Sequence, residues 1–437
     1  MKNRWPGRMQ TALIFLLTLS LAALTFALWL HDDPVRWDSA GPAAAAARLL
    51  GLVTPEPESI VVSRDLQYNE AARPNRIVWT TEQLHWGAQW DAALVDNVYD
   101  QHLKSPLGDA MGSAKPAGRR TIALWRHALT GDSLYVEFPS PLPLRALALW
   151  LSVEAPALRD IPVRRLALSF QEEVTFWYID ERDGVPYECQ TALIAREMPS
   201  VDPSGLSLRP CRFGFEDPAS FERTPHALLF DETPCPADAR YTPATLRPPD
   251  TDAFLRTLQI NPDTPARYDR EGVTTYLDDT LTRTCRFSPG TIHYQAPLDP
   301  FDQTDLSPAP PRTYEAIEQS RALLSTLSLL LGEARFSLDK AAPSPDGSVT
   351  VTFTYELNGL PVHLADEKPP AELVFREGQL IQADVRVLTF SLGNEGAPLL
   401  PEGWMYLLLS KSEGDFELRI SYGEEGGGLL TADWEYN

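Results

Sequence analysis

The sequence lacks the patterns by which catalytic and nucleotide-binding sites are usually recognised. It contains no G-x-G-x-x-G, no G-x-x-x-x-G-K-[ST] and no H-E-x-x-H, which excludes the common phosphate-binding loops and helix-borne zinc sites. An isolated histidine is usually a surface residue or a satisfied core residue. The histidines are all isolated, at positions 31, 85, 102, 127, 226, 293 and 363. We therefore expect no catalytic residue, no cofactor and no bound metal, and predict that the protein is not an enzyme.

Two weaker matches do not change this expectation. Ser337 and Lys340 fit the S-x-x-K spacing of penicillin-interacting serine enzymes, but the companion S-D-N and K-T-G elements are absent. The acidic pairs Glu172-Glu173 and Asp278-Asp279 could in principle hydrolyse sugars. Adjacent residues on a strand point to opposite faces, so neither pair is expected to share a cleft.

Cysteine is scarce, and its spacing argues against a zinc site. The chain has no C-x-x-C pair and no histidine pair near its cysteines. The four cysteines are Cys189, Cys211, Cys235 and Cys285. Four cysteines in an oxidising compartment can form two disulfides, in any of three connectivities. The alternative is that they are buried free thiols.

Positive charge is also in short supply. The chain has 38 Lys and Arg against 60 Asp and Glu, a formal net charge of -22. Phosphate backbones bind to basic faces, so nucleic acid is not an expected partner. The acidic excess is expected to serve solubility. It could also repel anionic wall polymers or attract cations, and the sequence does not decide between these roles.

One long hydrophobic run is present, at residues 11–30. It has no charged side chain and no proline. At about 1.5 Å of helical rise per residue it spans roughly 30 Å, the thickness of the hydrocarbon core of a bilayer. Lys2, Arg4 and Arg8 precede it, and Asp32 and Asp33 follow it. Because basic flanks stay in the cytoplasm, we expect a single-pass cell-membrane protein with a cytoplasmic N-terminus and an extracytoplasmic bulk.

A cleaved signal peptide is the alternative for this run. Its apolar region is typically only about 7 to 15 residues long and ends in small residues of the A-x-A kind. Here the run is longer and ends in Leu28, Trp29 and Leu30. Small residues, Ser20, Ala22, Ala23 and Ala27, could form a helix-packing face, or they are ordinary anchor residues.

The remainder predicts an α+β protein with antiparallel sheets, in two or three extracytoplasmic domains. The boundaries we predict are a cytoplasmic tail 1–10, a transmembrane helix 11–30, a juxtamembrane helix and linker 31–58, an N-terminal α+β region 59–240, a central helix-plus-hairpin domain 241–296, a Pro-rich linker 297–312 and a C-terminal helix-plus-sheet domain 313–437.

Local patterns predict the elements of these domains. Thr80 and Gln83 suggest a capping box that opens a helix, with Trp86, Trp90, Leu94 and Val98 on one face. Such a tryptophan pair could be a sugar platform, and core packing is the alternative. TIALW at 121–125 and SLYVEF at 133–138 read as strands.

The last domain has the strongest patterns. SVTVTFTYEL at 348–357 alternates between apolar and polar residues, which predicts a strand with one wet face. Asn358-Gly359 is a tight-turn signal, and Glu377-Gly378 is the expected turn of a further hairpin.

In this organisation the chain resembles the YycH/YycI regulatory proteins of Gram-positive bacteria. The segments that carry the resemblance are LLTLSLAALTFALWL, SLYVEFPSPLPLRALALWLSVEAP with IPVRRLALSF and VTFWYIDERDGVPYE, INPDTPARYDREGVTTYLDDTLTRTCRFSPGTIHY, and FTYELNGLPV with LVFREGQLIQADVRVLTF. They cover nearly the whole chain in order, as loose patterns without an invariant signature, and length and domain count favour YycH.

The resemblance implies a non-enzymatic role in signal transduction. YycH-like proteins associate with a YycI-like companion and with the membrane-bound sensor histidine kinase of a cell-wall two-component system, and they alter its activity. The resemblance implies a contact through transmembrane helices and through the extracytoplasmic part. The chain departs from the usual pattern in its four cysteines and 39 prolines.

Two other functions stay open from the sequence. A membrane-anchored receptor for a wall polymer or another ligand would use exposed aromatic side chains, and a cell-wall hydrolase would need a pocket with converging polar groups. The candidate aromatic residues are Trp86, Trp90, Trp125, Trp150, Trp177 and Trp404.

Overall fold

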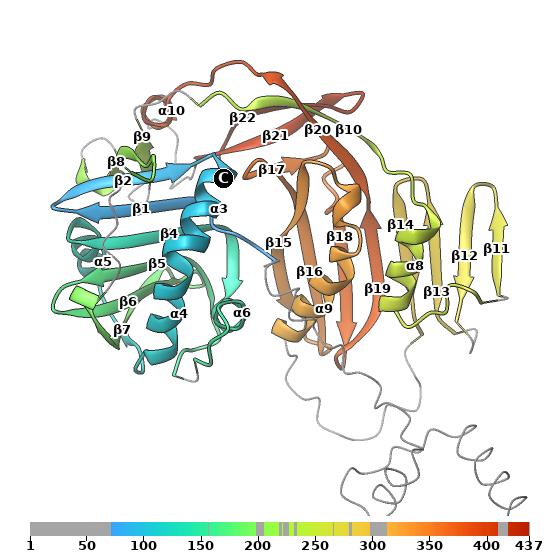
Figure 1. Ribbon diagram of the computed structural model, residues 1–437, viewed down its shortest axis with the longest axis horizontal. Coiled ribbons are helices and arrows are strands. Elements are labelled where there is room, and N and C mark those ends of the chain that lie inside the picture. Colours follow the sequence, from blue (N-terminus) through green and yellow to red (C-terminus); the bar gives the residue numbers. More distant parts are fainter. Residues whose placement is uncertain are drawn as a thin grey trace, which may run out of the picture. The chain divides into compact units, whose positions relative to one another are not determined.

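Two sheets with helices packed on them make up the part of the chain that the structure, a computed structural model, describes (Figure 1). The described residues are 71–155, 157–197, 205–217, 221, 227–230, 234–264, 266–278, 282–297, 313–409 and 418–436. They belong to one compact unit, residues 64–437. Nearly all strand pairs are antiparallel, which confirms the α+β fold class.

Several sequence predictions fall outside these residues. They are the cytoplasmic tail, the run 11–30, the juxtamembrane segment 31–58 and the linker 297–312 apart from Pro297. In the described ranges there is no helix with the length and apolar character needed to span a bilayer. The transmembrane segment therefore stays a prediction.

The first sheet has nine strands. They are β1 (Arg76–Thr81), β2 (Leu84–Gln89), β3 (Gly118–Arg119), β4 (Ser133–Pro143), β5 (Pro162–Phe170), β6 (Glu173–Asp180), β7 (Val185–Ile194), β8 (Arg209–Phe213) and β9 (Leu228–Phe230). Their order is β3-β7-β6-β5-β4-β1-β2-β8-β9. Strands β1 and β4 therefore lie at the centre of the sheet, where both faces can be buried.

The predicted helix at residues 80–98 is wrong over its first half. Glu82 and Gln83 both adopt left-handed backbone, with φ of 50° and 64°, and close a two-residue hairpin between β1 and β2. Positive φ at both central residues is the requirement of a tight hairpin turn, and Glu-Gln carries none of the usual Asn-Gly signal. Helix α3 (Ala92–Val98) begins only after Asp91, whose side chain accepts from the Leu94 N–H.

The predicted strand at 121–125 is also wrong. Thr121 is the N-cap of helix α5 (Ile122–Thr130), and its side chain accepts from the Leu124 N–H. Trp125 and Leu129, four residues apart, are both buried on one helix face. The window TIALW is too short to show this period, because a run of five residues fits either element.

Helices cover both faces of the first sheet. Helix α4 (Lys104–Ser113) and helix α6 (Leu144–Trp150) contribute to the larger apolar core on one face. Helix α5 packs on the other face, in a smaller core with Tyr135 and Trp177. Pro143 is the N-cap of α6, close to the position that the sequence predicts for it.

The second sheet has thirteen strands. They are β10 (Ala237–Pro243), β11 (Arg267–Arg270), β12 (Val273–Leu277), β13 (Thr284–Ser288), β14 (Thr291–Gln295), β15 (Ala334–Pro343), β16 (Ser348–Leu357), β17 (Leu360–His363), β18 (Ala371–Arg376), β19 (Gln379–Arg386), β20 (Leu388–Glu395), β21 (Leu418–Gly426) and β22 (Leu429–Tyr436). The order is β11-β12-β13-β14-β19-β18-β16-β17-β21-β22-β10-β20, and β15 pairs with β16.

This sheet joins segments that the sequence analysis assigns to separate regions. Strand β14 pairs along its length with β19, so strands from 241–296 and 313–437 form one sheet. Helices α8 (Pro248–Thr257) and α9 (Thr313–Ser325) contact each other. The predicted hairpins are present, with Asn358-Gly359 and Glu377-Gly378 in left-handed backbone at their turns.

The C-terminal part of the chain returns to the first sheet. Helix α10 (Glu402–Leu409) packs with β9 and β21 in a small core that includes Phe221, Tyr406 and Leu418. This contact places α10 and the start of β21 beside the first sheet, where the polar cluster described next is found.

Candidate functional site

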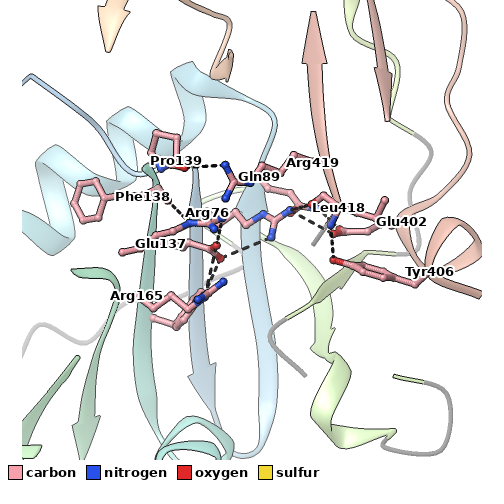
Figure 2. Close-up of polar contacts among 12 residues, drawn as sticks. Arg76, Gln89, Glu137, Phe138, Pro139, Arg165, Glu402, Tyr406, Leu418 and Arg419 are labelled. Carbon is pink, nitrogen blue, oxygen red and sulfur yellow. Dashed lines mark hydrogen bonds and ion pairs between the residues drawn. The ribbon is translucent and has the colours of Figure 1, made fainter. Parts of the chain in front are cut away.

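A row of polar side chains crosses four strands of the first sheet. Gln89 on β2, Arg76 on β1, Glu137 on β4 and Arg165 on β5 are successive cross-strand neighbours (Figure 2). Arg76 is 3% exposed and Glu137 is fully buried. Charges at such depth are stable only when they are paired, so each must have partners in the fold.

Glu137 is the centre of this row. Its carboxylate lies 2.6 Å from Arg164 Nη2, 3.7 Å from Arg76 Nη1 and 3.8 Å from Arg165 Nε. The Tyr135 hydroxyl donates to Glu137 Oε2 at 2.8 Å. Burial, with the carboxylate of Glu137 next in importance, raises the pKa of Tyr135 well above its usual range, so the phenol stays a donor.

The C-terminal segment completes the cluster. Glu402 on α10 is fully buried, and its two oxygens accept from Arg76 Nη2 at 3.3 Å and from Gln89 Nε2 at 3.2 Å. Arg76 Nη2 also donates to the Leu418 carbonyl at 3.4 Å, and Arg419 Nη1 donates to the Pro139 carbonyl at 3.3 Å. Figure 2 shows these contacts linking the first sheet to α10 and β21.

This buried ion cluster holds two parts of the chain together. Its carboxylates are paired with guanidinium groups, so the arrangement fixes α10 and β21 on the sheet. The cluster was not predicted from the sequence. Glu137, a charged residue inside the apolar strand SLYVEF, is the one signal that could have pointed to it.

A cavity of about 420 Å³ lies next to this cluster. Its lining comes from five segments, which are the junction of β2 and α3, the start of β8, the end of β9, the segment 234–236 and the turn between β16 and β17. Gln89 belongs to both features, because it lines the cavity and donates to Glu402. A volume of this size falls in the range of small-molecule sites.

The tryptophans proposed as a receptor surface are in different environments. Trp125, Trp150 and Trp177 are buried. Trp86 is half-buried on β2, and Trp90 is half-buried and lines the cavity. Trp404 on α10 is 64% exposed.

The other residues considered as catalytic or metal-binding candidates do not lie together in one site. Ser337 is buried in β15, whereas Lys340 lies beyond a bulge in that strand and is exposed. His85 is buried, with Nδ1 2.8 Å from Thr80 Oγ1 and Nε2 3.1 Å from Glu216 Oε1, as a satisfied core histidine is. Across the described ranges no group of three or more His, Cys, Asp or Glu could hold a metal ion.

The predicted helix-packing face, Ser20, Ala23 and Ala27, lies outside the described residues. The disulfides that were one alternative for the cysteines are not formed, because Cys189, Cys211, Cys235 and Cys285 are all free. Cys189 on β7 and Cys211 on β8 are six strands apart in the first sheet, roughly 29 Å at about 4.8 Å per strand. A disulfide needs Cα atoms within about 7 Å. Cys285 belongs to the second sheet.

Thiol reactivity tests this arrangement. We expect one cysteine per native chain, the exposed Cys235, to react rapidly with Ellman's reagent. Burial raises the pKa of Cys189 to about 12 and raises that of Cys211 and Cys285 further, so their thiolates are suppressed. Under denaturing conditions without reductant all four should react. A chain that shows fewer than four thiols when denatured, and regains them with reductant, would contain a disulfide that the structure lacks.

Comparison with known proteins shows which solved structure has a similar fold. No protein-family model and no curated protein matches the chain. Among solved structures, YycH from Bacillus subtilis aligns with a TM-score of 0.53 at 13% identity, over 85% of this chain and 94% of that one. The chain has the fold of YycH. An uncharacterized protein from Eubacterium rectale aligns with a TM-score of 0.29 at 8% identity, over 47% of this chain and 76% of that one.

The YycH match takes in both sheets, because 85% of the chain exceeds the share of either sheet alone. It confirms, at the level of the fold, the resemblance to YycH drawn from loose sequence patterns. At 13% identity individual side chains cannot be carried over from YycH, so the ion cluster and the cavity are properties of this chain.

Proposed function

We propose that this chain is a membrane-anchored extracytoplasmic regulator of a sensor histidine kinase in a cell-wall two-component system. The observation that carries the proposal is the YycH fold over 85% of the chain. The apolar run at 11–30 and its basic N-terminal flank support the anchor and its orientation. A YycI-like protein is the proposed companion, and the proposed role is not enzymatic.

Regulation of this kind needs only a modest free energy. A protein that binds one kinase conformation better than another shifts their ratio by its differential affinity. A tenfold shift corresponds to about 1.4 kcal/mol. Helix contacts in the bilayer and contacts made by the extracytoplasmic part of the chain could each supply a free energy of that size. In the bilayer, close approach of two helices favours small side chains such as Ala23 and Ala27.

Co-purification of the full-length chain from its native membrane after mild cross-linking tests the association. We expect a sensor histidine kinase among the captured proteins. Replacing both Ala23 and Ala27 with leucine should reduce its recovery several-fold, because the larger side chains separate the helices. Thr18→Leu with Thr25→Leu is the matched control, since at about 100° per residue these positions lie on the opposite helix face.

Capture of wall-synthesis or wall-degrading enzymes with no kinase contradicts the proposal. Equal kinase recovery when the whole run 11–30 is exchanged for an unrelated transmembrane helix contradicts the contact in the bilayer and leaves the extracytoplasmic part as the site of association.

A further inference from the structure

We propose that the cavity beside Trp90 binds a neutral oligosaccharide. Such binding is separate from the regulatory role and does not involve the kinase. The aromatic ring at the cavity, the polar groups around that ring and the rigidity of the walls support it.

Trp90 has an unusual backbone. It links β2 to Asp91, the N-cap of α3, with a φ of 57°, a left-handed conformation that bulky side chains rarely adopt. Strain of this kind persists only where the surroundings fix it, and it often marks a functional residue. Here the indole meets Trp434 edge to face at 5.6 Å and lies 6.2 Å from the Phe230 ring.

The wall beneath Trp90 is shaped for these rings. A Cβ at Gly87 would lie 2.9 Å from Phe230 Cζ and 2.9 Å from the Ile77 carbonyl oxygen, so glycine is needed for the close approach of that ring. Trp434 is fixed by its own Nε1, which donates to the Leu400 carbonyl at 2.9 Å. Trp90 is therefore held in place before any ligand arrives.

Polar groups surround this aromatic wall. Asp91, Arg209 and Asn358 line the cavity and are exposed, and Gln89 lines it with a buried Oε1 that has no hydrogen-bond partner in the described part of the chain. Carboxylate, guanidinium and amide groups together offer both donors and acceptors. A ligand with several hydroxyl or acetamido groups and one apolar face matches this set, and a pyranose ring is such a ligand.

The other walls are fixed by the backbone. The Pro234 and Pro236 carbonyls accept from Leu399 and Gly396 N–H groups at 2.9 and 3.2 Å. The turn carrying Asn358 rests on the start of α3, since a Cβ at Gly359 would lie 3.4 Å from that of Ala92. A site whose walls are ordered in advance binds without a large ordering penalty.

The charges at the cavity and on the whole chain favour a neutral saccharide. Asp91 and Arg209 bring opposite charges to the cavity, and the chain carries -22 overall. A field of that sign repels polyanions at long range. The cavity is therefore suited to a neutral glycan and not to a phosphate-bearing wall polymer.

Calorimetry on the full-length chain in a sugar-free detergent tests the proposal, with chitotetraose, a neutral N-acetylglucosamine oligomer, as the probe. We expect saturable binding with a Kd of about 1 mM or tighter. Trp90→Gly should weaken it at least tenfold, because glycine keeps the left-handed backbone and removes the ring. Trp90→Phe, which keeps an aromatic face, should retain part of the affinity.

Trp404→Ala is the matched control, because Trp404 is an exposed tryptophan on α10 that does not line the cavity. It should bind chitotetraose as the unmodified chain does. Thermal melting of each variant separates loss of binding from loss of folding. The proposal is overturned if the folded chain shows no saturation up to about 10 mM. Equal loss in the Trp90 and Trp404 variants, or binding of a polyglycerol phosphate in place of chitotetraose, also overturns it.

Discussion

Replacing Glu137 with alanine is expected to lower the free energy of unfolding by about 3–5 kcal/mol. The carboxylate is fully buried and lies against Arg76, Arg164 and Arg165, so its removal leaves buried guanidinium groups without their shared counter-charge. Urea denaturation followed by tryptophan fluorescence measures the change.

Two variants bracket this expectation. Glu137→Gln keeps the shape and a hydrogen-bond acceptor for the Tyr135 hydroxyl, so we expect a smaller but clear loss. Glu172→Ala removes an exposed carboxylate from the turn between β5 and β6 and should change stability by no more than about 0.5 kcal/mol. Equal and small effects at positions 137 and 172 would show that the cluster is not buried as described.

Replacing Trp125 with alanine is expected to destabilise the first sheet by about 3–5 kcal/mol. Trp125 is 0% exposed and meets Tyr135 and Trp177 edge to face at 6.3 and 6.4 Å. Truncation would open a cavity between α5 and the sheet. Thermal denaturation by circular dichroism gives the change.

Trp125→Phe should cost much less than the alanine variant. It keeps a ring in the core and removes an indole N–H that has no hydrogen-bond partner among the described residues. Trp404→Ala on the exposed face of α10 should fall within about 0.5 kcal/mol. If Trp125→Ala were as mild as Trp404→Ala, α5 would not cover this face of the sheet.

Some elements could be predicted from the sequence because the pattern and the local turn agree. In β16 the apolar residues at 349, 351, 353, 355 and 357 are buried as the alternation predicts, and Asn358-Gly359 closes the following hairpin. The β1–β2 hairpin was missed because its turn is formed by Glu82 and Gln83, whose left-handed backbone is imposed by strand pairing. The surrounding fold determines such a turn, so the conformational propensities of its residues do not predict it.

The candidate site could not be predicted for a different reason. The partners of Arg76 include Glu402 and the Leu418 carbonyl, which come from the far end of the chain. The cavity needs five separate segments. Trp90 was predicted on a helix face, whereas it directly follows strand β2. A single charged residue in an apolar strand, such as Glu137, indicates a buried charge. Only the fold shows which side chains neutralise that charge.

The autophosphorylation rate of the sensor histidine kinase that co-purifies with this chain tests the central claim most directly. It would be measured in the native membrane with the full-length chain present, and again after the chain is removed by deleting its gene and restored on a plasmid. We predict that the rate changes several-fold on removal and returns on restoration. An unchanged rate at full occupancy of the kinase, or the absence of any associated kinase, would contradict the proposed regulation.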